Sequence, residues 1–217
     1  NESYICSLIR KDEVAEFVSY VNQMNISLLS KIKSSIFETN TFLNDKEPTI
    51  LEYTTFFGSI QIFKYLINNE IELKGSLWEY AIHSNNAEII DILENKPIKP
   101  EDNSYLKCFE ESIKCHHNDI ANYIYDNLLI TNNNEDYYNI SIQYHNYLYF
   151  PDIDKLSSYF YFLYKYNYSN LINYLIQEKY YKQHQNEGII SKLISFFSDY
   201  QFNQMIQEAA NKDDTLG

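Results

Sequence analysis

Residues 49–67 read TILEYTTFFGSIQIFKYLI, and Gly58 stands between two apolar segments of this stretch. Four apolar residues follow Gly58 at positions that share one face of an α-helix: Ile62, Phe63, Leu66 and Ile67. Glycine adopts positive φ without steric cost, so it suits a sharp turn. The stretch therefore predicts a helix before Gly58, a tight turn, and a second helix with Ser59 as its N-cap residue.

The same pattern recurs at three further positions, where Asn85, His116 and Asn167 take the place of the glycine. Asn and His are enriched among the non-glycine residues with positive φ. Apolar pairs follow four and five residues later: Ile89 and Ile90, Ile120 and Ala121, and Leu171 and Ile172. The first three turns are 27 and 31 residues apart, but 51 residues separate His116 from Asn167. The pattern predicts a repeat protein of helix-turn-helix units that loses its regularity after His116.

The composition favours an acidic, all-helical protein. Hydrophobic residues make up 45% of the 217 residues, which is enough for a substantial core. With only 4 Gly and 4 Pro, the chain has few residues for the many tight turns of a β-sandwich or barrel. The formal charge of −13 argues against binding to nucleic acid or to an anionic membrane surface. It favours a basic or neutral protein partner.

The cysteines indicate a reducing compartment. Cys6, Cys108 and Cys115 are an odd number and lack the spacing of a disulfide framework. No signal peptide is evident, and no apolar run approaches the roughly 20 residues needed to cross a bilayer. We therefore expect a cytoplasmic protein, and the cytoskeleton is one location that fits this expectation.

The unit at residues 49–67 resembles the ankyrin repeat, whose pattern is T-P-L-H-x-A-A-x-x-G-H-x-E-V-V-x-L-L-L. The unit keeps Thr49, Leu51, Gly58 and the hydrophobic residues of the second helix. It departs from the pattern at Ile50, Glu52, Thr54 and Thr55, where ankyrin repeats have Pro, His and two Ala. The resemblance is specific mainly across residues 47–126. It implies an ankyrin-like helical solenoid with projecting turns and a concave partner-binding face, and it implies no catalysis.

The Tyr- and Asn-rich composition, together with the segment IKCHHNDI at residues 113–120, resembles the divergent ankyrin proteins of trichomonad protists. Those proteins carry a domain of unknown function beside their ankyrin arrays. On this reading, residues 1–46 form a degenerate capping repeat and a connection, and residues 47–130 form the ankyrin-like repeats. Residues 131–185 form irregular, aromatic-rich helical repeats. Residues 186–217 begin a further repeat, and we expect the chain to be part of a longer protein.

One cluster contains the residue types of a metal site: Cys108, Cys115, His116 and His117. Zinc sites commonly use closely spaced pairs such as Cys-x-x-Cys, and this cluster has none. A nucleophilic cysteine needs a facing His, whereas neighbours on a helix point about 100° apart. His116 is explained by its position in a turn. Taken with the missing ligand pairs and the missing facing histidine, this predicts no metal, no cofactor and no catalytic residue.

The resemblance also implies where a partner binds. In ankyrin arrays the two residues before the turn lie on an exposed edge and often contact a ligand. The equivalent residues here are Phe56 and Phe57, His83 and Ser84, and Lys114 and Cys115. We predict partner contacts at Phe56, Phe57, His83, Ser84 and Lys114. The two phenylalanines are expected to be exposed, so that alanine there weakens binding without changing thermal stability.

Residues 159–162 are four consecutive aromatics, which must point all round a helix. Exposed tyrosines are typical of interfaces. We therefore predict further partner contacts at Tyr159, Tyr161 and Tyr164, with simple internal packing as the alternative.

Together these features predict a non-catalytic scaffold or adaptor that binds a protein partner on its concave face. The alternative is a structural subunit buried in a large multi-protein assembly, for example a cytoskeletal one. A third hypothesis is a metal protein or enzyme that uses Cys108, Cys115 and His117.

Overall fold

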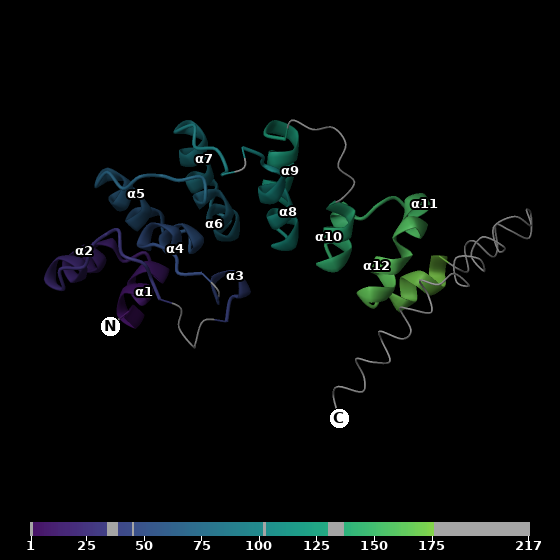
Figure 1. The fold of residues 1–217 in the computed structure, drawn as a ribbon, viewed down its shortest axis with the longest axis horizontal. Helices are drawn as coiled ribbons and strands as arrows, with labels where there is room; N and C mark the ends of the chain where they lie inside the picture. Colours follow the sequence, from purple (N-terminus) through teal and green to yellow (C-terminus); the bar gives the residue numbers. More distant parts are fainter. Residues whose placement is uncertain (1, 34–38, 45, 102, 130–136, 176–217) are drawn as a thin grey trace, which may run out of the picture. The chain divides into compact units, whose positions relative to one another are not determined.

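The computed structural model describes the chain except for residues 1, 34–38, 45, 102, 130–136 and 176–217 (Figure 1). It divides into two compact units, residues 1–150 and 151–217. The described residues form helices joined by short connections and contain no strand beyond an isolated bridge between Lys31 and Thr49. The predicted all-α class is therefore confirmed for this part of the chain. No described helix is long and apolar enough to cross a membrane.

The first unit is built mainly from helix pairs. In chain order its helices are α1 (Glu2–Arg10), α2 (Val14–Gln23), α3 (Thr41–Asn44), α4 (Ile50–Phe56), α5 (Ile60–Asn68), α6 (Leu77–Ser84), α7 (Ala87–Asn95), α8 (Leu106–Lys114), α9 (Asn118–Asn127), α10 (Tyr137–Gln143) and the 3-10 helix η1 (Tyr147–Tyr149). The pair α4 and α5 is the one that residues 49–67 predict.

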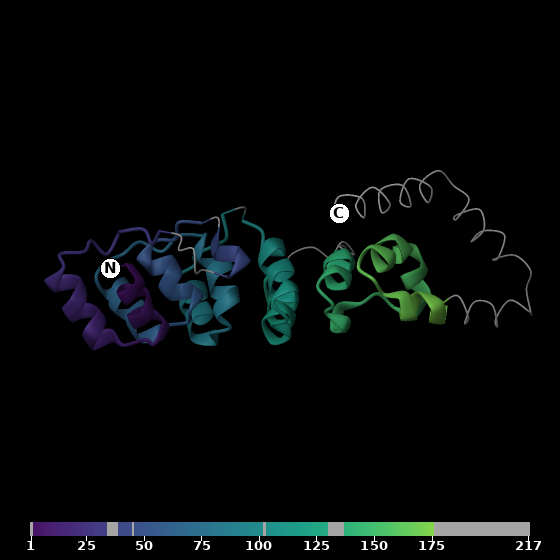
Figure 2. The same cartoon turned by 90° about the horizontal axis from the view of Figure 1, so that it is seen from below.

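The helices of the first unit pack in two rows. α1, α4, α6, α8 and α10 form an inner row in which each helix contacts the next. Each of α2, α5, α7 and α9 folds back against its own inner helix and forms an outer row (Figures 1 and 2). Each pair therefore buries its apolar face against its neighbours.

The four predicted turn residues all have positive φ, as expected. Gly58 has φ 66°, Asn85 50°, His116 59° and Asn167 63°. His145 has φ 57° and lies 29 residues after His116, in the interval where the sequence predicts no turn. The left-handed turn therefore recurs in this interval, but η1 follows it in place of an amphipathic α-helix, so the apolar register of the earlier pairs does not recur.

Most residues of the apolar registers predicted for α5, α7 and α9 lie in the core, whereas Ile67 of α5 is half-buried. Ile62, Phe63 and Leu66 of α5 are fully buried. The corresponding residues of α7 and α9 are also buried: Ile89, Ile90, Leu93, Ile120, Ala121 and Ile124. Burial of a large aliphatic or aromatic side chain contributes about 1.5–3 kcal/mol, so these residues hold the rows together.

After four of the left-handed turns, at Gly58, Asn85, His116 and His145, the next residue binds a backbone carbonyl of the preceding pair. The bonds run from Ser59 Oγ to Ile9 O (2.5 Å), Asn86 Nδ2 to Gly58 O (3.0 Å), His117 Nδ1 to Ile82 O (2.7 Å) and Asn146 Nδ2 to Ile113 O (2.9 Å). A side-chain donor at this position therefore fixes each turn to the one before it.

Ser59 is the N-cap residue of α5, as predicted, but its side chain does not cap the helix. Its hydroxyl is directed to Ile9, and it makes no capping bond to the helix. The Asp12 carboxylate, from the turn of the preceding pair, accepts hydrogen bonds from the backbone N–H groups of Gln61 and Ile62, both at 2.9 Å. The backbone N–H groups in the first turn of α5 therefore find their hydrogen-bond acceptor in the preceding helix pair.

The second unit contains α11 (Ile153–Leu156), the 3-10 helix η2 (Ser157–Tyr159) and α12 (Phe160–Lys165). η2 separates the two α-helices. After the turn at Asn167, residues 169–175 are helical. The further repeat expected at residues 186–217 lies outside the described residues.

Candidate functional site

A groove with a volume of about 650 Å³ crosses the ends of α4, α6 and α8 in the first unit. Its lining includes all five residues predicted there: Phe56, Phe57, His83, Ser84 and Lys114. They come from equivalent positions at the ends of three successive inner helices. The stacking of these helices places them side by side, and we call this surface the groove.

Two parts of the groove lie outside the predicted positions. Thr41 and Phe42 of α3 line one side, and Tyr144 lines another. α3 lies in the segment that the sequence assigns to a connection. Asn40 Oδ1 accepts a hydrogen bond from the Phe42 N–H at 2.9 Å at the start of this short helix. The adjacent apolar residues Phe42 and Leu43 are the sequence signal that this connection packs against the core.

One end of the groove is aromatic. Phe42 stacks on Phe56 with ring centroids 5.8 Å apart, and the His83 ring lies 4.1 Å from Phe42 and 5.0 Å from Phe56. Phe57 is half-buried, and the Arg10 guanidinium carbon lies 4.9 Å from the centre of its ring. Phe57 is therefore the accessible aromatic residue of the predicted pair.

The expectation that Phe56 is exposed is wrong, because only 8% of its surface is accessible. Phe42 and His83 cover its ring. Replacing a buried phenylalanine by alanine costs about 3–5 kcal/mol. Contrary to the expectation from the sequence, alanine at Phe56 should lower thermal stability.

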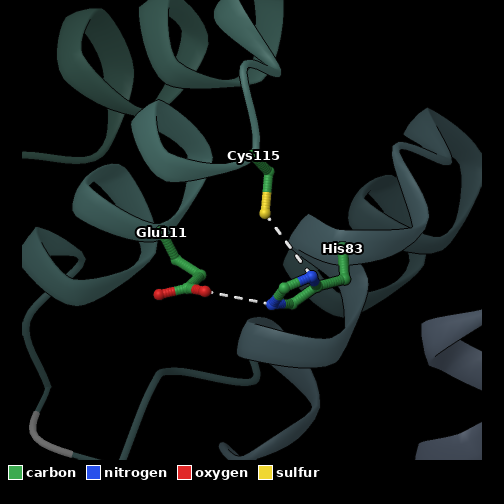
Figure 3. Close-up of side chains that lie close together, drawn as sticks. All are labelled: His83, Glu111 and Cys115. Atoms are coloured by element: carbon green, nitrogen blue, oxygen red, sulfur yellow. Dashed lines mark hydrogen bonds and ion pairs between the residues drawn. The ribbon is translucent and has the colours of Figure 1, made fainter. Parts of the chain in front are cut away.

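The other end of the groove is polar, and three side chains meet there (Figure 3). His83 Nε2 lies 3.0 Å from Glu111 Oε1, and Cys115 Sγ lies 3.4 Å from His83 Nδ1. Lys114 Nζ donates to the second oxygen, Glu111 Oε2, at 2.9 Å. Because a carboxylate only accepts, Nε2 carries the proton and Nδ1 accepts from the thiol.

These contacts change the ionisation of the groups involved. Burial alone would raise the pKa of Glu111, but hydrogen bonds from His83 and Lys114 outweigh it and lower the pKa to about 2. Burial opposes the charge of Lys114, yet its bond to Glu111 raises the pKa of that amine. Burial, and then the negative charge of Glu111, raise the pKa of Cys115 to about 11. The Cys115 thiol is therefore protonated near neutral pH, unlike an activated nucleophile.

The structure separates the cluster of possible metal ligands that the sequence suggests. Cys108 is buried in the core, the His116 Nε2–H donates to Tyr144 O at 2.7 Å, and His117 donates to Ile82 O. Cys115 instead meets His83 and Glu111, the one group among the described residues that has three close donor atoms of metal-ligand type. The sequence signal for it is weak, since only the four-residue spacing of Glu111 and Cys115 on α8 is local.

The predicted tyrosines of the second unit differ in exposure. Tyr161 is 43% exposed and Tyr164 51%, whereas Tyr159 is half-buried and Phe160 is buried. Four consecutive aromatic residues therefore do point to different surroundings, as predicted.

Comparison of the chain with models of protein families, with curated proteins and with solved structures found no match.

Proposed function

We propose that this chain is a non-catalytic, ankyrin-like helical solenoid that recruits a protein partner through the groove. The observation that carries the proposal is the groove lining. Residues from equivalent positions at the ends of three successive inner helices, α4, α6 and α8, lie together in one concave surface. The repeated helix pairs, the left-handed turns and the turn-to-carbonyl bonds support a repeat architecture. Repeat proteins present such concave surfaces to partners.

The chemistry of the groove favours a neutral or basic segment with an apolar anchor. Phe42 and Phe57 offer half-buried aromatic surface, which is typical of the centre of an interface. Glu111 is the one carboxylate in the lining, and it already binds His83 and Lys114. Affinity is therefore expected mainly from apolar contact, while the formal charge of −13 disfavours strongly acidic partners.

A blocking substitution tests this proposal. Thr41 is exposed at the side of the groove, so Thr41→Arg adds bulk there without disturbing the core. Gln61→Arg makes the same change of charge at an exposed position of the outer helix α5. Both variants should melt like the parent chain. A partner captured from native extract by the parent should be lost with Thr41→Arg and retained with Gln61→Arg. Retention by Thr41→Arg at unchanged affinity would contradict the proposal.

The alternative function, a structural subunit of a large assembly, is favoured by exposed apolar side chains away from the groove. In the first unit Tyr147 is 68% exposed and Leu148 63%, and the second unit exposes Tyr161 and Tyr164. Adjacent exposed residues of this kind mark contact surfaces. A purified chain that stays monomeric and soluble at high concentration would contradict this alternative.

A further inference from the structure

We propose that Cys115 and His83, oriented by Glu111, form a binding site for a divalent transition-metal ion of the zinc type at the polar end of the groove. Three donor atoms, one each from His83, Glu111 and Cys115, lie within 4.8 Å of one another. The proposed ligands are the Cys115 sulfur and a His83 nitrogen, and the proposal does not rest on the partner-binding function proposed above.

The helices position the three side chains. Glu111 and Cys115 are four residues apart at the end of α8, so they share one face of that helix. His83 comes from the last turn of α6, the neighbouring helix of the inner row. His83 and Glu111 retain only 12% and 19% of their side-chain exposure. Partial burial of this kind limits the rotamers available to each side chain.

The distances suit coordination by the Cys115 sulfur and the His83 Nδ1 atom. Tetrahedral zinc has bonds of about 2.3 Å to sulfur and about 2.0 Å to nitrogen, which places these two ligands about 3.5 Å apart. The observed separation of Sγ and Nδ1 is 3.4 Å. An ion would take the place of the thiol proton, which is released as the thiolate forms.

Glu111 acts here as a positioning residue. It accepts the Nε2–H of His83 at 3.0 Å, and this bond leaves Nδ1 as the nitrogen with a free lone pair for an ion. A carboxylate on the second ring nitrogen is the usual companion of a metal-binding histidine. Lys114 holds the other oxygen of Glu111 at 2.9 Å and so fixes the orientation of the carboxylate.

The rest of the coordination shell faces the groove. Two protein ligands leave the remaining positions for water or for a side chain that enters the groove, one protein ligand fewer than the three of catalytic zinc sites. Thiolate and imidazole together select zinc-like ions over calcium or magnesium, which prefer oxygen ligands.

Cobalt(II) tests the site because a cobalt–thiolate bond gives a charge-transfer absorption band. The full chain, first freed of metal with a chelator, is titrated with Co²⁺ alone. We expect a near-ultraviolet band that saturates at one Co²⁺ per chain and disappears when Zn²⁺ is added. The band should vanish with Cys115→Ala, persist with Cys6→Ala, and weaken strongly with His83→Ala.

Glu111→Gln separates a positioning role from ligation. The band should remain, but Co²⁺ affinity should fall about 10- to 100-fold. Absence of the band in the parent chain overturns the proposal without any variant. A band of unchanged strength in Cys115→Ala, with the same melting temperature as the parent, overturns it as well.

Discussion

At the level of single residues, His83 joins the two ends of the groove. Its ring packs against Phe42 and Phe56, and its nitrogens contact Glu111 and Cys115. The sequence predicts a partner contact at His83, but no local pattern predicts that His83 contacts Glu111 and Cys115. Glu111 and Cys115 lie 28 and 32 residues further along the chain, and only the packing of α6 on α8 brings them to His83.

Glu111 should make the metal-free protein less stable in acid. Its folded-state pKa of about 2 lies below the ordinary value of 4.5. A lowered pKa contributes stability above pH 4.5, and this contribution is lost as the pH falls toward 2. In the presence of chelator, Glu111→Gln should lower the free energy of unfolding at pH 7 by about 3 kcal/mol.

Urea unfolding from pH 7 to pH 2 measures this difference, which should shrink below pH 4.5. Glu88→Gln is the matched control, because its ion pair with Lys64 is about half exposed and such pairs contribute little. If the difference in unfolding free energy between the parent chain and Glu111→Gln did not change with pH, the negative charge of Glu111 would not be what stabilises the fold.

At the level of secondary-structure elements, the turns connect one helix pair to the next. Asn86 Oδ1 accepts bonds from the N–H groups of Glu88 and Ile89 at the start of α7, while its Nδ2 donates to Gly58 O. A single side chain thus caps its own helix and binds the previous turn. The positive φ at Asn85 could be predicted from residue type, but the bond to Gly58 could not, because it joins residues 28 apart.

Asn86→Ala should remove both interactions. A lost N-cap costs about 1 kcal/mol and a lost hydrogen bond to a half-buried carbonyl about 1 kcal/mol, so we expect about 2 kcal/mol in total. Thermal or urea unfolding checks this value. Asn69→Ala is the control, since the Asn69 amide is exposed and donates only within its own helix, to Tyr65 O. Equal effects of the two substitutions would mean that the inter-turn bond contributes nothing.

At the level of the whole molecule, the spacing of the turns and the residue types in them predict the regular helix pairs well. The helix pairs around Gly58, Asn85 and His116 and their buried apolar registers follow from local spacing. Some of the missed features depend on partners distant in sequence. Phe56 is covered by Phe42 from a connection, and Asp12 caps a helix of another pair. The turn at His145 is missed for a local reason, because no amphipathic α-helix follows it.

Backbone hydrogen exchange, measured for the full chain with and without the captured partner, tests whether the groove is the binding surface. We expect the partner to slow exchange at residues 40–42, 55–58, 82–85 and 111–117, which line or adjoin the groove. Exchange in the outer helices α5, α7 and α9 should not change. Slower exchange confined to those outer helices, or to the exposed tyrosines around residues 161–164, would contradict the assignment of the groove.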